Sequence, residues 1–339
     1  MRRSSPKALR ATITIVLLFV IIVSLLIIDG EPTVVQIPSD YDGQAAVDAL
    51  NWSQFAYTQY VTNTAYLCNS VMLFERLHSL KSKPDRVMMY PSEFSLDEKD
   101  NDLEGRLLRK ARDEYNVKLV PIKVQSRSSW DSTWAESFTK LLAFNQTQYR
   151  RVLNLDSDST LLQSMDELFF APPCPLGIPR AYWLNPDERV QSSMLLLIQP
   201  SHFEFKRITA AINNASRSEY DMEIVNNLYK DSALILPHRP WTMLTGEFRG
   251  DTHTKYLGND QEAWNPDEMV REAKFIHFSD WPVSKPWIET PLSIMEREKP
   301  RCQFNATSGQ EDDCRNRDYW LGFYSDFKKR RADICGEEV

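Results

Sequence analysis

A short apolar run that stops at two aspartates constrains this chain more than any other feature. Val152, Leu153 and Leu155 form the run, and Asp156 and Asp158 follow it. An apolar run of this length bounded by polar residues predicts a buried strand, and ligands of open α/β sheets gather at the carboxyl ends of strands. Two carboxylates at such an edge repel each other, so the pattern indicates a site for Mg²⁺ or Mn²⁺ carrying a substrate phosphate. The alternative interpretation is a solvated turn after the strand.

The N-terminal region predicts a membrane anchor. Residues 11–28 carry no charge and no proline, basic residues precede them, and Asp29 and Glu31 follow. This run is close to the lower limit for a spanning helix, and the positive-inside rule places the N-terminus in the cytoplasm. A cleaved signal peptide is the alternative, but no small-x-small cleavage site precedes Asp29. The expected organisation is a cytoplasmic tail at 1–10, a transmembrane anchor at 11–28, a stem at 29–52, a luminal domain at 53–300 and a C-terminal extension at 301–339.

Composition narrows the class of protein. The net charge of −7, with acidic and basic residues interspersed, gives no electrostatic footprint for nucleic acid. Apolar runs beyond residues 11–28 are short, which indicates a membrane-tethered globular domain. N-glycosylation sequons agree with a luminal address; they begin at Asn51, Asn145, Asn214 and Asn305.

The cysteines predict a disulfide near the C-terminus. Of the 5 cysteines, Cys302, Cys314 and Cys335 lie close to the end of the chain, and disulfides persist in an oxidising lumen. Because the count is odd, at least one thiol is free or pairs between chains. Cys68 and Cys174 complete the set.

Strand and helix patterns alternate along the chain, which predicts an α/β fold. Strands are expected at residues 55–61, 86–90, 118–122, 152–155, 180–183, 193–198, 233–237 and 274–278, and helices near 66–80, 103–115 and 134–144. This order implies a mostly parallel central sheet flanked by helices on both faces. The run 193–198 is apolar throughout, as in a strand covered on both faces. The tail after Cys302 is charged, and no element is predicted there.

A series of short motifs resembles a known family. The motifs are Thr62-Asn63-x-x-Tyr66, Phe138-Thr139-Lys140-Leu141, Asp156-x-Asp158, Asp221-Met222-Glu223, His277-Phe278 and Lys285-Pro286-Trp287. In this order they resemble the family 8 retaining glycosyltransferases, the glycogenin-like group, and within it most of all the fungal Golgi N-acetylglucosaminyltransferases. The resemblance spans roughly residues 52–290. It implies a GT-A type fold for transfer from nucleotide-diphospho-sugars, here preceded by one transmembrane helix.

The resemblance implies a metal site. Asp156 and Asp158 would hold Mn²⁺, with Mg²⁺ as the alternative ion, and His277 would be the third ligand. The metal neutralises the departing UDP, and an imidazole beside two aspartates favours Mn²⁺. For His277 the alternative is a hydrogen-bonded core residue.

The resemblance also implies nucleotide-binding residues. Thr62, Asn63 and Tyr66 would meet uridine, with Tyr66 stacked on the uracil. Lys140 would lie near the nucleotide-sugar, and Lys285 would place a compact positive charge on the diphosphate. The alternatives are a helix-core aromatic for Tyr66 and ordinary solvated lysines for Lys140 and Lys285.

Asp221 matches the carboxylate that relatives place beside the donor sugar. Retention of configuration leaves two roles open for it, a nucleophile or a stabiliser of oxocarbenium charge. Two departures from the family pattern accompany it. Many relatives have Asn-Ser-Gly where this chain has Gln191-Ser192-Ser193, and the loop at 279–284 lacks the glycine that relatives often have.

The function that follows from the resemblance is that of a single-pass type II Golgi enzyme. It would move N-acetylglucosamine from a UDP donor to a mannose-containing glycan. The expected partners are the UDP-sugar, the glycan acceptor, the membrane and a second copy of the chain in a homodimer, with no nucleic acid. The alternatives are UDP-glucose or UDP-galactose as donor, a non-catalytic nucleotide-sugar-binding relative, and a purely structural luminal protein.

Overall fold

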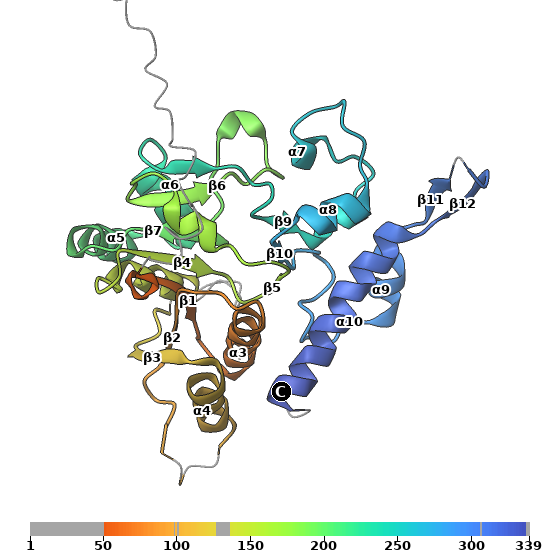
Figure 1. Ribbon diagram of the computed structural model, residues 1–339. Coiled ribbons are helices and arrows are strands. Elements are labelled where there is room, and N and C mark those ends of the chain that lie inside the picture. The colour runs from red at the N-terminus through yellow and green to blue at the C-terminus, as the bar shows by residue number, and fades with distance from the viewer. Residues whose placement is uncertain (1–50, 98, 100–101, 127–135, 306, 337–339) are drawn as a thin grey trace, which may run out of the picture. The chain divides into compact units, whose positions relative to one another are not determined.

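The computed structural model describes residues 51–97, 99, 102–126, 136–305 and 307–336 (Figure 1). The predicted tail, the anchor and all but the last residues of the stem lie outside the described residues. Among the helices of this described part, none is long and apolar enough to cross a membrane. The longest of them, α10 (Arg315–Cys335), carries arginine, lysine and aspartate along its length. Within the described residues, this finding contradicts the predicted single-pass type II Golgi membrane protein.

A seven-stranded sheet in the order β3-β2-β1-β4-β7-β6-β8 forms the centre of the described unit. Among its described strands, β7 alone runs antiparallel to its neighbours. The predicted α/β fold with a mostly parallel sheet is therefore confirmed. The strands are β1 (Phe55–Tyr60), β2 (Asp85–Pro91), β3 (Val117–Ile122), β4 (Arg151–Leu155), β6 (Leu176–Pro179), β7 (Leu195–Ile198) and β8 (Leu234–Leu236).

Both faces of this sheet are buried, because alternate residues of its strands enter two different hydrophobic cores. Leu195 and Leu197 of β7 belong to one core, and Leu196 and Ile198 belong to the other. The prediction of a strand covered on both faces is thus confirmed. Helices α3 (Thr64–Ser79) and α4 (Leu103–Tyr115) contribute to the first core, and α5 (His202–Asn214) and α6 (Asp221–Tyr229) to the second.

A second, three-stranded sheet lies beside the first. In it β10 (Phe275–His277) pairs antiparallel with β5 (Ser159–Leu161) and parallel with β9 (Met243–Leu244). Because β5 follows β4 directly, this pairing brings a late segment of the chain to the end of β4. The other α-helices of the described residues, apart from α10, are α7 (Thr254–Leu257), α8 (Pro266–Glu272) and α9 (Leu292–Glu298).

Two predicted elements differ in the structure. The strand expected at 180–183 is absent, because only Arg180 forms an isolated bridge, with Gln191, after β6 has ended. The helix expected at 134–144 is a 3₁₀ helix, η2 (Ser137–Asn145), and residues 134–135 lie outside the described residues. The buried residues Phe138, Leu141 and Phe144 follow one another at intervals of three, the repeat of a 3₁₀ turn.

The C-terminal segment is ordered around α10, which the sequence did not predict. A hairpin of β11 (Gln303–Asn305) and β12 (Gln310–Asp313) precedes the helix. The face of α10 that enters the core recurs every three or four residues; it consists of Trp320, Tyr324, Phe327, Arg331 and Cys335. A Cys302–Cys314 disulfide confirms the predicted C-terminal bridge, a second disulfide joins Cys68 of α3 to Cys335, and Cys174 is free.

Loss of the Cys68–Cys335 bridge should cost more stability than loss of Cys302–Cys314. The first bridge joins residues 267 positions apart and the second joins residues 12 apart. The longer loop loses more entropy in the unfolded chain when it is closed, which corresponds to about 5 kcal/mol against about 3 kcal/mol. Denaturant unfolding of Cys335→Ala and Cys302→Ala measures both free energies. An equal loss in the two variants would contradict a stabilising role for the long-range bridge.

Candidate functional site

The two aspartates lie at the carboxyl end of β4, where hydrogen bonds hold the strand on both sides. The amide of Asp156 donates to the carbonyl of Met194 at 3.0 Å. On the other side, the Gln59 side chain in β1 donates to the carbonyl of Leu155 at 2.6 Å. The Asp-x-Asp segment is therefore held at the carboxyl end of a central strand. The sequence predicted its place after a buried strand.

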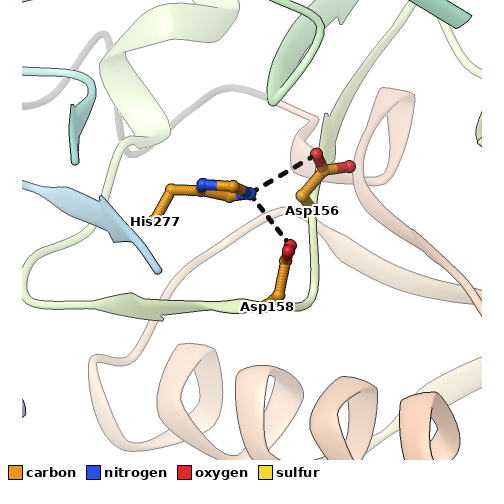
Figure 2. Close-up of side chains that lie close together, drawn as sticks. All are labelled: Asp156, Asp158 and His277. Carbon is orange, nitrogen blue, oxygen red and sulfur yellow. Dashed lines mark ion pairs between the residues drawn. The ribbon is translucent and has the colours of Figure 1, made fainter. Parts of the chain in front are cut away.

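His277 reaches the aspartates through the pairing of β10 with β5, which places it opposite Ser159. Its Nε2 lies 3.1 Å from Oδ1 of Asp158 and 3.9 Å from Oδ2 of Asp156 (Figure 2). The amide of Phe278 also donates to the carbonyl of Asp158 at 3.0 Å. The imidazole is thus held against both carboxylates by backbone pairing.

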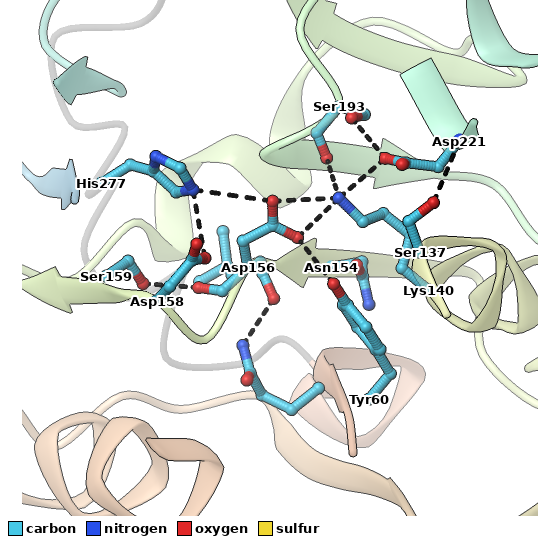
Figure 3. Close-up of polar contacts among 12 residues, drawn as sticks. Tyr60, Ser137, Lys140, Asn154, Asp156, Asp158, Ser159, Ser193, Asp221 and His277 are labelled. Carbon is cyan, nitrogen blue, oxygen red and sulfur yellow. Dashed lines mark hydrogen bonds and ion pairs between the residues drawn. The ribbon is translucent and has the colours of Figure 1, made fainter. Parts of the chain in front are cut away.

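Lys140 joins Asp156 to Asp221. Its Nζ, on the buried turn η2, lies 2.7 Å from Oδ1 of Asp156 and 2.8 Å from Oδ2 of Asp221 (Figure 3). Asp221 is the first residue of α6, and it accepts a hydrogen bond of 2.6 Å from the Ser193 hydroxyl. The lysine is almost fully buried, with a side-chain exposure of 4%. The solvated-lysine alternative is therefore wrong for Lys140.

Lys285 contacts the carboxylate of Asp158, and Tyr66 packs on the tryptophan that follows Lys285 by two residues. Nζ of Lys285 lies 2.7 Å from Oδ2 of Asp158 and also donates to the carbonyl of Phe278. The Tyr66 ring meets the Trp287 ring edge to face, with centroids 5.5 Å apart. Burial, followed by the charges of Asp158 and Asp156, raises the pKa of Tyr66, so its hydroxyl stays protonated near the site.

Thr62 and Asn63 lie at the carboxyl end of β1, as expected, but their described contacts serve helix α3. The Asn63 side chain caps this helix by accepting a hydrogen bond from the amide of Tyr66 at 3.2 Å. Its amide group lies 3.5 Å from the Thr62 hydroxyl. Direct contacts link six of the predicted site residues: Lys140, Asp156, Asp158, Asp221, His277 and Lys285. The described contacts of Thr62 and Asn63 do not reach this group.

Burial and neighbouring charges shift the pKa values of Asp156 and Asp158 in opposite directions. Burial, reinforced by the charge of Asp158, raises the pKa of Asp156 to about 6, and Lys140 and His277 oppose that rise. Burial also acts to raise the pKa of Asp158, but His277 and Lys285 hold it well below its usual value. Asp158 is therefore ionised at neutral pH.

The pair Lys140 and Asp221 is charged as well. Burial opposes the charge on Lys140, but Asp156 and Asp221 raise its pKa above the ordinary value. Burial would raise the pKa of Asp221, whereas Lys140 and hydrogen bonds from Ser193 and Ser137 lower it. The site thus holds ionised groups of both signs at hydrogen-bonding distance in a buried position.

The donor set fits a divalent cation. One ligand atom from each of Asp156, Asp158 and His277 lies within 4.8 Å of the others. Ligand atoms that each lie about 2.1 Å from one ion are at most about twice that distance apart. Nε2 of His277 meets this limit, because it lies 3.1 Å from Oδ1 of Asp158 and 3.9 Å from Oδ2 of Asp156. Two carboxylate oxygens and an imidazole nitrogen are donor atoms that divalent metal ions accept.

Sequence patterns did not single out three residues that support this site. Ser193 binds Asp221, and Tyr60 directs its hydroxyl to Oδ1 of Asp156 at 3.5 Å. Asn154 ties β4 to β1 by donating to the Thr58 hydroxyl at 3.0 Å. The sequence offered two signals for them, the polar Asn154 inside an otherwise apolar strand and Ser193 at a departure from the glycogenin-like pattern.

Comparisons with known proteins identify the family. No protein-family model matches the chain. It is 56% identical over 294 residues to "Glucose N-acetyltransferase 1" of Gibberella zeae, with 84% of this chain and 63% of that relative covered. It is 44% identical over 300 residues to the protein of the same name from Aspergillus fumigatus, with 84% of this chain and 78% of that relative covered.

The structure is similar to that of the WbbM bifunctional glycosyltransferase, with a TM-score of 0.50 at 14% identity over 70% of this chain and 47% of that one. This likeness shows a glycosyltransferase fold. The chain spans 63% of the length of the Gibberella zeae relative. Because the chain is 44% identical to the Aspergillus fumigatus protein and covers 78% of that relative, it belongs to the family of proteins named Glucose N-acetyltransferase 1.

Proposed function

We propose that the chain is a metal-dependent retaining glycosyltransferase of family 8, with a GT-A fold, that moves N-acetylglucosamine from a UDP donor to a mannose-containing glycan. The observation that carries the proposal is the convergence of Asp156, Asp158 and His277 beside the Lys140–Asp221 pair at one edge of the sheet. The name of the relatives supports N-acetylglucosamine over the glucose and galactose alternatives.

The charges of the site match a metal-bound diphosphate. Asp156, Asp158 and Asp221 face the ammonium groups of Lys140 and Lys285, which leaves one negative charge when all are ionised. A divalent cation would change the site to one positive charge, suited to the two negative charges of a diphosphate. When bound, the metal would neutralise the charge that develops on the departing UDP.

Asp221 would act on the donor sugar by electrostatics. Lys140 and Ser193 hold its carboxylate at 2.8 and 2.6 Å. A carboxylate that is already paired and hydrogen-bonded is a weaker nucleophile, but it remains a fixed negative group for a developing positive charge. This arrangement supports a stabilising role for Asp221 over covalent attack.

Lys285 and Tyr66 would bind the other parts of UDP. The ammonium group of Lys285 lies beside Asp158 and would meet the diphosphate. Tyr66 and Trp287 form an aromatic pair at the start of α3, and an aromatic face there would stack on uracil. Thr62 and Asn63, at the end of β1, would contact the nucleoside.

The full chain should release UDP from one UDP-sugar only when Mn²⁺ is present. The reaction needs the cation on the leaving diphosphate, so chelation should abolish the release. The measurement is UDP release with and without a mannoside acceptor. The donor panel consists of UDP-N-acetylglucosamine, UDP-glucose and UDP-galactose. Binding of Mn²⁺ and UDP without any turnover across the panel would support the non-catalytic alternative, and no binding would refute the site.

Asp158→Ala should lower the rate of transfer by about 100-fold or more, because the metal supplies several kcal/mol of transition-state stabilisation. The fold should persist, since the side chain serves charged groups at the edge of the sheet. Asp251→Ala, at an exposed position, is the matched control and should keep the parent rate. Equal activity of the two variants would refute the role of Asp158.

Lys140→Met should destabilise the fold by about 3–5 kcal/mol, because it leaves Asp156 and Asp221 buried without their cation. Lys285→Met is the comparison, since the side chain of Lys285 is 24% exposed and water can replace part of its charge. The free energy of unfolding in denaturant measures both variants. A larger loss for Lys285→Met would show that Lys140 is not the central ion-pair partner.

A further inference from the structure

We propose that the C-terminal helix α10 positions the metal-binding and phosphate-binding groups through Asp280. Asp280 lies in the loop of residues 278–285, which joins His277 to Lys285 and is called the bridging loop below. The inference rests on the proposed function, in which His277 binds the metal and Lys285 the diphosphate. It adds Asp280 and the helix that holds it as positioning elements.

Asp280 is anchored inside the protein by the helix. Its side chain has an exposure of 0%. Oδ1 accepts a hydrogen bond from the Trp320 indole at 3.0 Å, and Oδ2 accepts one from the Tyr324 hydroxyl at 2.9 Å. Nη1 of Arg249 lies 3.7 Å from Oδ1. A buried carboxylate is stable only when charge and hydrogen bonds compensate it, so its position is tied to these donors.

The anchor also fixes the backbone of the bridging loop. The hydroxyl of Thr245 donates to Oδ2 of Asp280 and accepts a hydrogen bond from the amide of Ser279 at 3.0 Å. Arg249 donates to the carbonyl of Asp280 at 2.8 Å. A Cβ on Gly246 would lie 2.8 Å from the carbonyl oxygen of Ser279. The backbone of the bridging loop therefore packs directly against the backbone at Gly246.

Rings of α10 pack against the residue that follows His277. Phe278 meets Tyr324 and Phe327 edge to face, with centroids 5.3 and 5.1 Å apart. The backbone of Phe278 in turn bonds the carbonyl of Asp158 and accepts from Lys285. A displacement of the loop would therefore move His277 and Lys285 together relative to Asp158.

Further along the same buried face, the C-terminal part of α10 is fastened to α3, the helix that carries Tyr66. Arg331 donates to the carbonyl of Ala65 at 3.0 Å and to the Asn69 side chain. The disulfide from Cys335 to Cys68 joins the same two helices covalently. Helix α10 thus holds both the bridging loop and the start of α3. Metal sites tolerate displacements of about 0.2 Å in ligand distance, so such bracing affects binding as well as stability.

Tyr324→Phe tests the proposal, with Tyr319→Phe as the matched control. Both hydroxyls lie on α10 and donate to an aspartate, Tyr324 to Asp280 at 2.9 Å and Tyr319 to Asp267 of α8 at 2.8 Å. Phenylalanine keeps the ring that packs on Phe278, and Asp280 keeps its other donors, so the fold should survive. We expect the dissociation constant of Mn²⁺ with UDP, measured by electron paramagnetic resonance, to rise about tenfold in Tyr324→Phe and to stay unchanged in Tyr319→Phe.

Hydrogen exchange separates failure of this proposal from failure of the proposed function. Tyr324→Phe in the full chain should speed amide exchange in residues 277–288, while Tyr319→Phe should not. Faster exchange with unchanged Mn²⁺–UDP affinity would overturn the positioning role and leave a purely structural contact. Unchanged exchange in both variants would overturn the bracing itself. If the parent chain binds no Mn²⁺–UDP, the proposed function fails, and the exchange result alone decides whether α10 holds the loop.

Discussion

The ion pairs of Lys140 with Asp156 and Asp221 are the interaction on which the arrangement of the site depends. Burying charges is favourable only when partners and hydrogen bonds compensate them closely. Here each member comes from a different element: η2 carries the lysine, the end of β4 carries Asp156, and the start of α6 carries Asp221. The requirement to pair these groups therefore fixes how the 3₁₀ turn and α6 meet the edge of the sheet.

The same arrangement prepares the site for a charged ligand before one binds. Lys140 and Lys285 already balance most of the carboxylate charge, and backbone pairing of β5 with β10 holds His277 against Asp158. Fixed groups of this kind lose little energy to reorganisation when charge develops. Under the proposed function, electrostatic compensation needed for folding would also serve catalysis.

Local patterns in the sequence predicted the sheet and the position of Asp156 and Asp158 directly after a buried strand. The other candidate site residues came from the family resemblance, and neither source predicted the long-range polar contacts. The apolar runs at 152–155 and 193–198 allowed few structures other than buried strands. Trp320, Tyr324 and Phe327 have helical spacing, but Leu321 and Phe323 lie between them and the residues before and after this stretch are mostly charged or polar. No single apolar face therefore stands out in the sequence. The Cys68–Cys335 bridge and the Ser193–Asp221 bond join distant segments, and no local periodicity encodes such pairs.

The two departures from the glycogenin-like pattern that the sequence resembles lie where the structure has polar contacts. Ser193 stands where many relatives have glycine, and its hydroxyl holds Asp221. The bridging loop has no glycine, and its central aspartate faces α10 rather than the metal-site carboxylates. A glycine-rich loop can bring backbone amides to a phosphate, whereas this loop is fixed by a buried side chain. In this protein the diphosphate would therefore depend more on Lys285 and the metal, and the C-terminal helix would hold the bridging loop in place.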